Sequence, residues 1–284
     1  MTPDVVVDIG NSRLKWGRCQ RGRVTEMVSL PLDQPQAWEQ RRQNWKLPQP
    51  CRWAIATVNP PAADRFCLWV RQYGDAVHVL DDPALLPLQL GVDEPRRVGW
   101  DRLLNALAAH CLAAPEPAAV VAVGTAMTVD LIDGQGVFRG GAILPGPRLM
   151  ADALHRHTAL LPALDLTELP TAAAPGTNTS EAIRAGIRAA LVGGAFLLVH
   201  QYAELVGPLW VFLTGGALGQ LSQWDFGSRF RATRYVPTLT LEGLRIAAES
   251  LPDNLPPTPV PSSTPGPDHP PFPPVAATSD GPVG

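Results

Sequence analysis

The same short pattern occurs twice in this chain: a buried strand, a turn that contains glycine, and a second strand. In the first half, an apolar run over residues 4–9 leads to Gly10, and a strand is predicted over 12–17. In the second half, an apolar run over 118–123 leads to Gly124 and another strand follows. Each half then continues with a third strand and with helices that alternate with strands. The order of elements therefore predicts an internal structural repeat.

The spacing of apolar residues, and the Gly and Pro residues that end helices and strands, predict the elements after the two turns. In the first half they are strands over 23–30, 52–58 and 76–80, and helices over 35–44, 61–73 and 103–112. In the second half they are strands over 127–132, 137–143, 209–213 and 230–236, helices over 147–160, 180–205 and 239–250, and a short helix after 216. This layout resembles that of the actin-like and sugar-kinase-like ATPases. The predicted class is α/β, with duplicated ribonuclease-H-like domains, each a mixed βββαβαβα sheet.

Proline divides the chain into its parts. Pro115 and Pro117 end the helix over 103–112 and mark a boundary, which gives domains over 1–116 and 117–250. Twelve of the 31 prolines lie in residues 252–284, which contain no Lys or Arg. A segment of this composition cannot bury a core, so we predict a disordered Pro-rich tail over 251–284.

The net charge, the hydropathy and the cysteine spacing exclude several classes of protein. The net charge of −3 gives no general attraction to nucleic acid or to anionic membrane. The apolar stretches near 118–132 and 189–199 are short or interrupted, so no membrane span is expected. The four cysteines show no Cys-x-x-Cys spacing, and the N-terminus lacks a signal-peptide pattern. We therefore expect a cytoplasmic protein with reduced thiols.

The first glycine turn has the chemistry of a phosphate site. Gly10 lets the backbone approach a phosphate, and Asn11 and Ser12 offer hydrogen-bond donors. Asp8 at the strand end can hold a hydrated Mg²⁺, and Lys15 can supply a positive charge to phosphates. A plain hairpin with a surface lysine is the alternative.

The second glycine turn occupies the matching place of the repeat. Gly124 and Thr125 offer an amide and a hydroxyl to a phosphate chain, whereas Thr128 and Asp130 could be ordinary strand residues that face outward. A third turn at residues 214–216 ends a strand and suits nucleotide contacts, although it could be a simple connection. Two equivalent turns together favour a nucleotide site.

The segment Gly99-Trp100-Asp101-Arg102 precedes the helix over 103–112. Asp101 could cap that helix. In a kinase it would accept the proton of a hydroxyl group, and Arg102 could bind a carboxylate or phosphate.

Five motifs, in this order and at these spacings over residues 4–250, resemble those of type III pantothenate kinases. They are Asp8-x-Gly-Asn, Gly99-x-Asp-Arg, Gly124-Thr-Ala-x-Thr-x-Asp130, Gly141-Ala-Ile-Leu-Pro-Gly146, and Asn178-Thr179 with Gly186. The resemblance implies ATP-dependent phosphorylation of pantothenate to 4'-phosphopantothenate, the first step toward coenzyme A.

The resemblance also implies residue roles, a magnesium ion, a monovalent cation (K⁺ or NH₄⁺) and a homodimer. Asp101 would be the proton acceptor, and Thr179 would reach the substrate of the partner subunit; alternatively, Thr179 caps its helix. The other implied substrate contacts are Gly99, Trp100, Asp101 and Arg102. The implied ATP contacts are Asp8, Ile9, Gly10, Asn11, Ser12, Arg13, Leu14, Lys15 and Thr125.

Two positions depart from the family pattern. Ala122 stands where the family has an aspartate that binds the monovalent cation, so we expect a weakened cation site, or one rebuilt from carbonyls and Asp130. Val92 stands where the family commonly has a tyrosine near the pantothenate pocket. Val92 leaves open a kinase of this fold for another hydroxyl or amine, and Ala122 leaves open a catalytically weak nucleotide-binding regulator.

Overall fold

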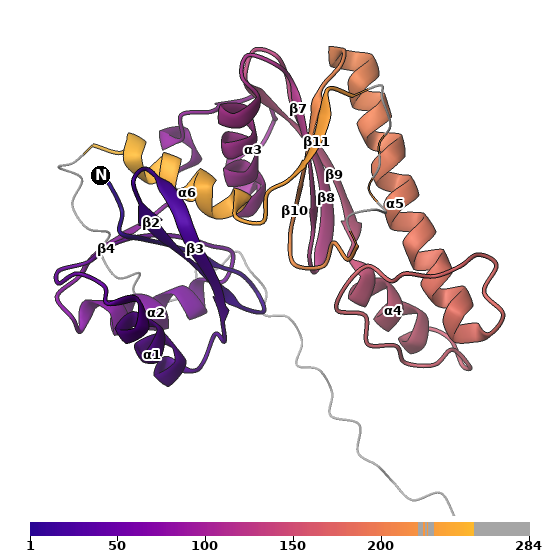
Figure 1. Ribbon diagram of the computed structural model, residues 1–284, viewed down its shortest axis with the longest axis horizontal. Coiled ribbons are helices and arrows are strands. Elements are labelled where there is room, and N and C mark those ends of the chain that lie inside the picture. Colours follow the sequence, from indigo (N-terminus) through magenta and orange to yellow (C-terminus); the bar gives the residue numbers. More distant parts are fainter. Residues whose placement is uncertain (221–223, 225, 227–229, 253–284) are drawn as a thin grey trace, which may run out of the picture.

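Two mixed β-sheets stand side by side in the computed structural model, with helices between them and on their outer faces (Figure 1). The structure describes residues 1–220, 224, 226 and 230–252. The first sheet has the order β3-β2-β1-β4-β5. Its strands are β1 (Val5–Ile9), β2 (Leu14–Gln20), β3 (Arg23–Leu30), β4 (Arg52–Thr57) and β5 (Ala76–Val79).

The second sheet repeats the topology of the first. Its order is β11-β10-β7-β8-β9-β6, so β9-β8-β7-β10-β11 matches β3-β2-β1-β4-β5 position by position. In both sheets the first three strands are antiparallel and the next two join in parallel. The strands are β6 (Gln89–Leu90), β7 (Ala118–Val123), β8 (Ala126–Ile132), β9 (Val137–Pro145), β10 (Trp210–Thr214) and β11 (Ala232–Tyr235). The predicted repeat and α/β class are confirmed.

The helices form three layers around the two sheets. Helices α1 (Pro35–Trp45) and α2 (Pro60–Arg71) cover the outer face of the first sheet. Helices α3 (Trp100–Ala113) and α6 (Leu239–Ser250) lie between the sheets. Helix α5 (Thr179–Val206) packs on the outer face of the second sheet, next to α4 (Pro147–Arg156). Two short 3₁₀ turns cover Pro83–Leu85 and Pro95–Arg97.

Elements of each half contact the other half. Strand β6 pairs with β9 in the second sheet, and α6 packs on β1 of the first. A side chain at Gly243 in α6 would overlap the backbone of Leu104 in α3, so the missing Cβ lets these helices approach closely. The terminal amine of Met1 donates to the carbonyl of Leu251 at 2.8 Å. The division at 116/117 stays a prediction, and the packing ties its two parts together.

Some expectations fall outside the described residues or change in detail. The tail beyond residue 252 lies outside them. The short helix expected after 216 is absent from the described residues between β10 and β11.

Helix α5 is long and apolar enough to cross a membrane by length and composition alone, a test that a core helix also passes. Its side chains Ile187, Leu191 and Val199 are buried against the second sheet.

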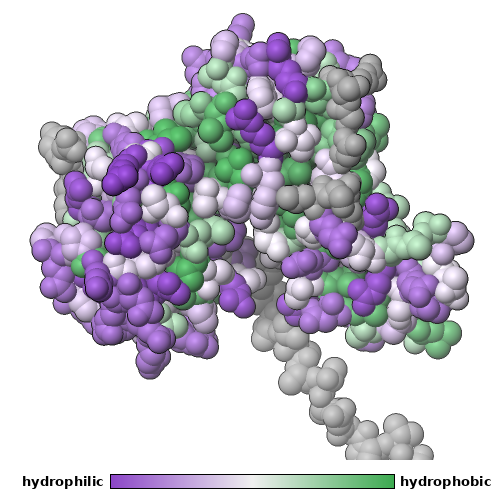
Figure 2. Space-filling model, viewed as in Figure 1, coloured by the Kyte–Doolittle hydropathy of each residue, from purple (hydrophilic) through white to green (hydrophobic). Residues whose placement is uncertain are grey.

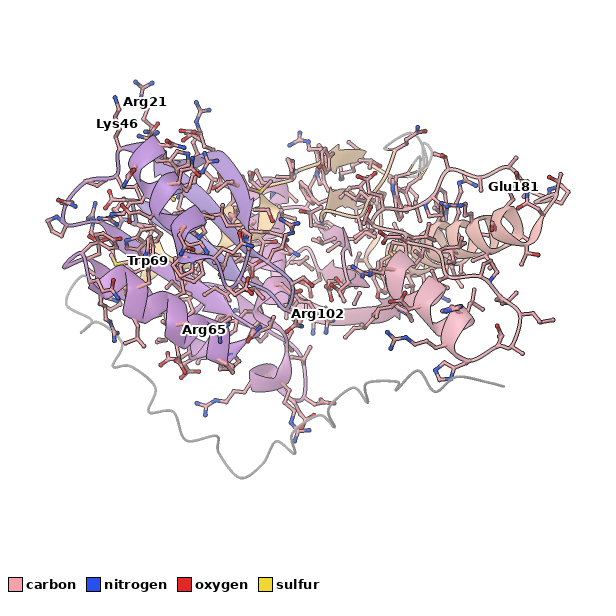
Figure 3. All side chains as sticks on the ribbon, turned by 90° about the horizontal axis from the view of Figure 1, so that it is seen from below. Arg21, Lys46, Arg65, Trp69, Arg102 and Glu181 are labelled. Carbon is pink, nitrogen blue, oxygen red and sulfur yellow. The ribbon has the colours of Figure 1, made fainter. Side chains whose placement is uncertain are left out.

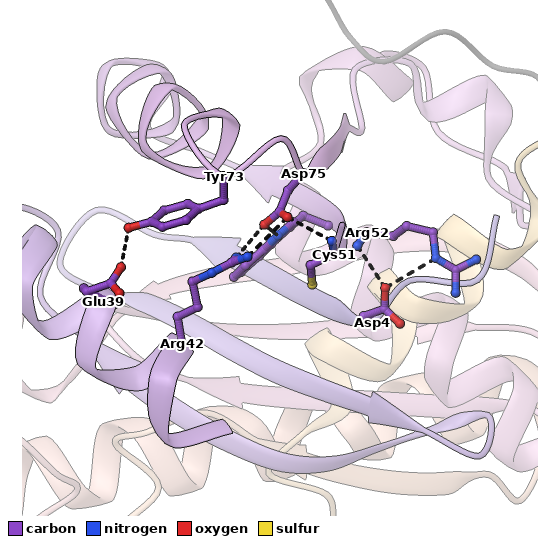
Figure 4. Close-up of polar contacts among 8 residues, drawn as sticks. Asp4, Glu39, Arg42, Cys51, Arg52, Tyr73 and Asp75 are labelled. Atoms are coloured by element: carbon purple, nitrogen blue, oxygen red, sulfur yellow. Dashed lines mark hydrogen bonds and ion pairs between the residues drawn. The ribbon is translucent and has the colours of Figure 1, made fainter. Parts of the chain in front are cut away.

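A buried ion pair ties α1 to the first sheet (Figure 4). Arg42 donates to the Asp75 carboxylate at 2.5 and 3.3 Å. The same carboxylate accepts from the backbone amide of Cys51 and from Nε1 of Trp53, each at 2.9 Å. Neither partner's side chain is more than 5% exposed. Asp75 therefore joins α1 to β4 from a buried position.

Replacing one member of this pair should destabilise the fold strongly. Asp75→Asn leaves the guanidinium of Arg42 buried without a counter-charge, which typically costs about 3–5 kcal/mol. We expect urea denaturation to show a loss of this order in the free energy of unfolding. Glu26→Gln is the control: its pair with Arg18 is solvent-exposed, so its loss should cost less than about 1 kcal/mol. Equal losses in both variants would contradict the role assigned to Asp75.

Candidate functional site

The first glycine turn connects β1 to β2 at one end of the first sheet. The amide of Gly10 donates to the carbonyl of Arg13 at 3.1 Å and closes the turn. Asn11, Ser12 and Arg13 are exposed at its tip, whereas Ile9 and Leu14 are fully buried in the core. Ile9 and Leu14 can therefore contact a nucleotide only through their backbone.

Asp8 and Lys15 face each other across this hairpin. They are paired in register, and Lys15 Nζ lies 3.8 Å from Asp8 Oδ2. Burial raises the pKa of Asp8, Lys15 opposes the rise, and the negative charge of Asp101 adds to it. Among the described residues, no hydrogen-bond donor reaches the Asp8 carboxylate. The charge of Asp101 therefore acts on Asp8, although the two residues are far apart in the sequence.

The second glycine turn meets two other glycine segments at the ends of β7, β9 and β10. The amide of Gly146 donates to the carbonyl of Thr125 at 2.9 Å, and Thr125 itself is exposed. A Cβ at Gly146 would overlap the carbonyl of Gly124. Gly215, with φ of 103°, lies against Val123 in the same way. The second and third predicted turns thus form one continuous backbone surface.

The segment Gly99–Arg102 forms the N-terminus of α3, with Gly99 as its N-cap residue. Asp101 is exposed in the first turn, and its side chain makes no capping hydrogen bond. A Cβ at Gly99 would lie 2.6 Å from Asp101 Oδ1, so the carboxylate folds back over this glycine. Trp100 is half-buried against the core between the sheets. The carboxylate of Asp101 is therefore accessible to a substrate and not used as a cap.

Arg102 binds a residue of the second sheet. Its Nη2 and Nε donate to Asp130 Oδ1 at 2.5 and 3.0 Å. Asp130 and Thr128 are both buried, so neither faces outward as an ordinary strand residue. Both oxygens of Asp130 accept from Arg102, and the positive charge of this guanidinium opposes the binding of a monovalent cation at the same carboxylate.

Thr179 lies apart from these residues. The N-cap of α5 is Asn178, which accepts from the amide of Glu181 at 3.0 Å, so Thr179 is the first helical residue and is exposed. Glu181, at this end of α5, is well separated from Arg102 (Figure 3). Within one chain the structure does not bring Thr179 to the Asp8–Asp101 region.

The two departures from the family pattern occupy defined places. Ala122 stands between Thr214 of β10 and Thr128 of β8, both buried. Val92 packs against the core between the sheets, and a Cβ at Gly140 would lie 3.3 Å from its Cγ1.

Comparison with known proteins places the chain in a family. The profile of the family described as type III pantothenate kinase matches residues 5–201. The chain is 36% identical to the type III pantothenate kinase of Alkalilimnicola ehrlichii over 255 residues, which cover 87% of this chain and 98% of that protein. It is 34% identical to that of Cupriavidus pinatubonensis, over 76% of this chain and 88% of the relative.

A solved structure supports the fold. A protein of Sinorhizobium meliloti, described as a candidate 2-dehydro-3-deoxygalactonokinase, superposes with a TM-score of 0.52 at 12% identity and covers 87% of this chain and 98% of its own. At this identity the likeness concerns the fold alone, which is that of the sugar-kinase-like ATPases. On the profile match and the relatives' identity, the chain belongs to the type III pantothenate kinase family.

Proposed function

We propose that this protein transfers the γ-phosphoryl group of ATP to the primary hydroxyl of pantothenate and so begins coenzyme A synthesis. Family membership supports the reaction. The structural observation that carries the proposal is the placement of two aspartates: Asp8 is paired with Lys15 beside the first glycine turn, and Asp101 is exposed in the first turn of α3 and raises the pKa of Asp8 through its charge. A carboxylate at the nucleotide turn and another at the acceptor segment are what this transfer needs.

The proposed mechanism assigns the residues by location. Asp101 accepts the hydroxyl proton as the oxygen attacks the γ-phosphorus, and its exposure leaves room for the substrate. The amides of Gly10 and Gly124 donate within their own turns, so Lys15 and the amides of Asn11 and Ser12 hold the phosphates, and the Thr125 hydroxyl adds a donor. Arg102 binds the acidic acceptor. Phosphoryl transfer depends mainly on positioning and charge neutralisation, which these groups supply.

Asp8 fits a magnesium ion. Its buried carboxylate has Lys15 as its only ion-pair partner among the described residues, and the charge of Asp101 makes an added cation favourable. Magnesium keeps several waters and needs few protein ligands, so a single aspartate beside phosphates suffices. When bound, the ion would neutralise charge on the phosphates.

Substrate choice is tested by an ATP-coupled assay over a panel of acceptors. We expect turnover that depends on pantothenate, because Arg102 offers a cation to its carboxylate. The panel is needed because valine at position 92 is smaller than the tyrosine common in the family, and this difference can change the acceptor pocket. Stronger turnover with a different hydroxyl or amine acceptor would favour a same-fold kinase. No turnover with any acceptor, despite ATP binding, would favour a regulator.

The outer face of α5 favours a homodimer. Leu197 is 61% exposed, and Leu205, about two turns further along the same helix, is 76% exposed. Figure 2 shows more hydrophobic residues at the surface of the half that holds the second sheet than over α1 and α2. We propose that a second copy covers this face and that Thr179 reaches the partner's acceptor site.

The thiols fit a cytoplasmic enzyme. All four cysteines are free, and burial raises the pKa of Cys19 and of Cys51 to about 12. Such thiols stay protonated and unreactive at neutral pH. We propose the cytoplasm as the location.

Ala122 should make the enzyme insensitive to potassium. The alanine side chain supplies no oxygen, and the positive charge of Arg102 beside Asp130 opposes a second cation there, so we propose the weakened cation site and not the rebuilt one. Replacing KCl by NaCl at constant ionic strength should change turnover less than about twofold, because a cation that does not bind cannot shift an equilibrium. Ala122→Asp should introduce a potassium requirement. A full, saturable potassium requirement in the unaltered protein would contradict this proposal.

A further inference from the structure

Arg102 is held by a carboxylate that has no contact with solvent. The side chain of Asp130 is 0% exposed and that of Arg102 is 14% exposed. Burial raises the pKa of Asp130, and the guanidinium of Arg102 opposes this rise. A buried carboxylate of this kind is costly unless it is paired. Among the described residues, Arg102 is the only cation that pairs with Asp130. The buried carboxylate therefore fixes the orientation of the Arg102 side chain.

The β8–β9 pair is shaped to make room for this carboxylate. Asp130 stands directly opposite Gly141, and the register shifts between Asp130 and Ile132. A Cβ at position 141 would lie 2.5 Å from Asp130 Oδ1 and would overlap the carbonyl of Val129. Any side chain at 141 would therefore take the space that the carboxylate needs. The β-bulge in β9 includes Gly140, whose φ is 84°. It places Gly141 opposite Asp130.

The pair leaves one edge of the guanidinium free. Asp130 binds the side edge, formed by Nε and Nη2. The ring of Phe138 lies 5.8 Å from the guanidinium carbon. Among the described residues no acceptor reaches Nη1, so the end edge, formed by Nη1 and the second hydrogen of Nη2, remains available. A guanidinium can bind one carboxylate on each of these edges.

We infer that Asp130, seated against Gly141, is a positioning residue that orients Arg102 so that its free edge binds the carboxylate of the acidic acceptor. This inference rests on the proposed function. Asp130 touches no reacting atom: it holds the side edge of Arg102, and Arg102 holds the substrate. The acceptor is thereby recognised as a carboxylate, and its hydroxyl end is left to the adjacent Asp101.

The first test separates the two Michaelis constants. Asp130→Asn removes the charged acceptor on Arg102, so the KM for pantothenate should rise about 10–100-fold, the effect of losing a charge-assisted hydrogen bond. The KM for ATP and kcat should stay within about threefold. Asp133→Asn is the matched control, because Asp133 pairs with Arg139 on the same two-strand hairpin but does not contact Arg102. The control should leave the KM for pantothenate unchanged.

A double-mutant cycle tests whether Asp130 acts through Arg102. In an Arg102→Ala background, Asp130→Asn should cause no further rise in the KM for pantothenate. Additive effects would overturn the inference, because Asp130 would then act by another route. A fall in KM in Asp130→Asn would also overturn it, since Asp130 would then compete with the substrate for Arg102.

Arg102→Lys covers the case in which Asp130→Asn does not fold. The lysine leaves Asp130 with a cationic partner, but its ammonium cannot present two carboxylate-binding edges. We expect a folded protein with a KM for pantothenate raised at least about tenfold. A normal KM in this variant, or a rise confined to the KM for ATP, would overturn the inference. If the unaltered protein does not phosphorylate pantothenate at all, the proposed function fails instead.

Discussion

Asp101→Asn should lower kcat by about 10²–10⁴-fold, the range that a general base contributes. The amide cannot accept the hydroxyl proton. Asp101 is exposed and makes no capping bond in α3, so its replacement should not affect folding. Thermal denaturation and ATP binding should therefore match those of the unaltered protein, and steady-state kinetics measure the loss.

Glu94→Gln is the matched control for this variant. Glu94 lies shortly before α3 and is also exposed, and among the residues that the structure describes it pairs only with Arg97. Its replacement removes a charge close to Asp101 in sequence without touching the proposed base, so kcat should stay unchanged. Near-normal turnover in Asp101→Asn would rule out Asp101 as the proton acceptor. Comparable losses in both variants would point to a general charge effect.

Two inactive variants should restore activity when they are combined. If Thr179 serves the partner's site, a mixed dimer of Asp101→Asn and Thr179→Glu chains contains one site with both original residues. Thr179→Glu places a negative charge at a helix N-terminus, which the helix dipole tolerates, but the charge repels an acidic acceptor. Co-expression in equal amounts should restore about a quarter of the unaltered activity, because half of the dimers are mixed and each has one intact site.

Ser180→Glu provides the control for the added charge. It puts the same carboxylate on the next residue of α5, whose side chain points in a different direction, and the variant should stay active. Mixed preparations that stay inactive, while each variant is folded and dimeric, would contradict a site shared between subunits. Full activity of Thr179→Glu alone would remove Thr179 from the site.

Much of the fold follows from the sequence because each half has the same order of elements. The glycine turns after β1 and β7 and the third strand in each half identify the repeated unit, and the sheet order then agrees in both halves. The packing of α3 and α6 between the sheets does not follow, since hydrophobic period shows that a helix has a buried face but not which sheet covers it. Strand β6, with two residues, is too short to give an alternating pattern.

The site is predictable where its residues are neighbours in the chain. Asp8 and Lys15 face each other because a short hairpin joins them, and Asp101 and Arg102 share one helical turn. The link between Arg102 and Asp130 depends on how α3 packs on the second sheet. The position of the Asp130 carboxylate against Gly141 depends on strand register and on a β-bulge, which the sequence does not specify. In the sequence, this part of the site is indicated only by two motifs, one that ends at Asp130 and one that begins at Gly141.

The most direct measurement is identification of the product. Purified protein is incubated with ATP, magnesium and pantothenate, and the products are followed by phosphorus NMR and mass spectrometry, with Asp101→Asn as the parallel sample. We expect 4'-phosphopantothenate and ADP in equal amounts from the unaltered protein, and about 10²–10⁴-fold less of each from the variant in the same time. ATP turnover without a phosphorylated pantothenate, or equal product from both proteins, would contradict the account.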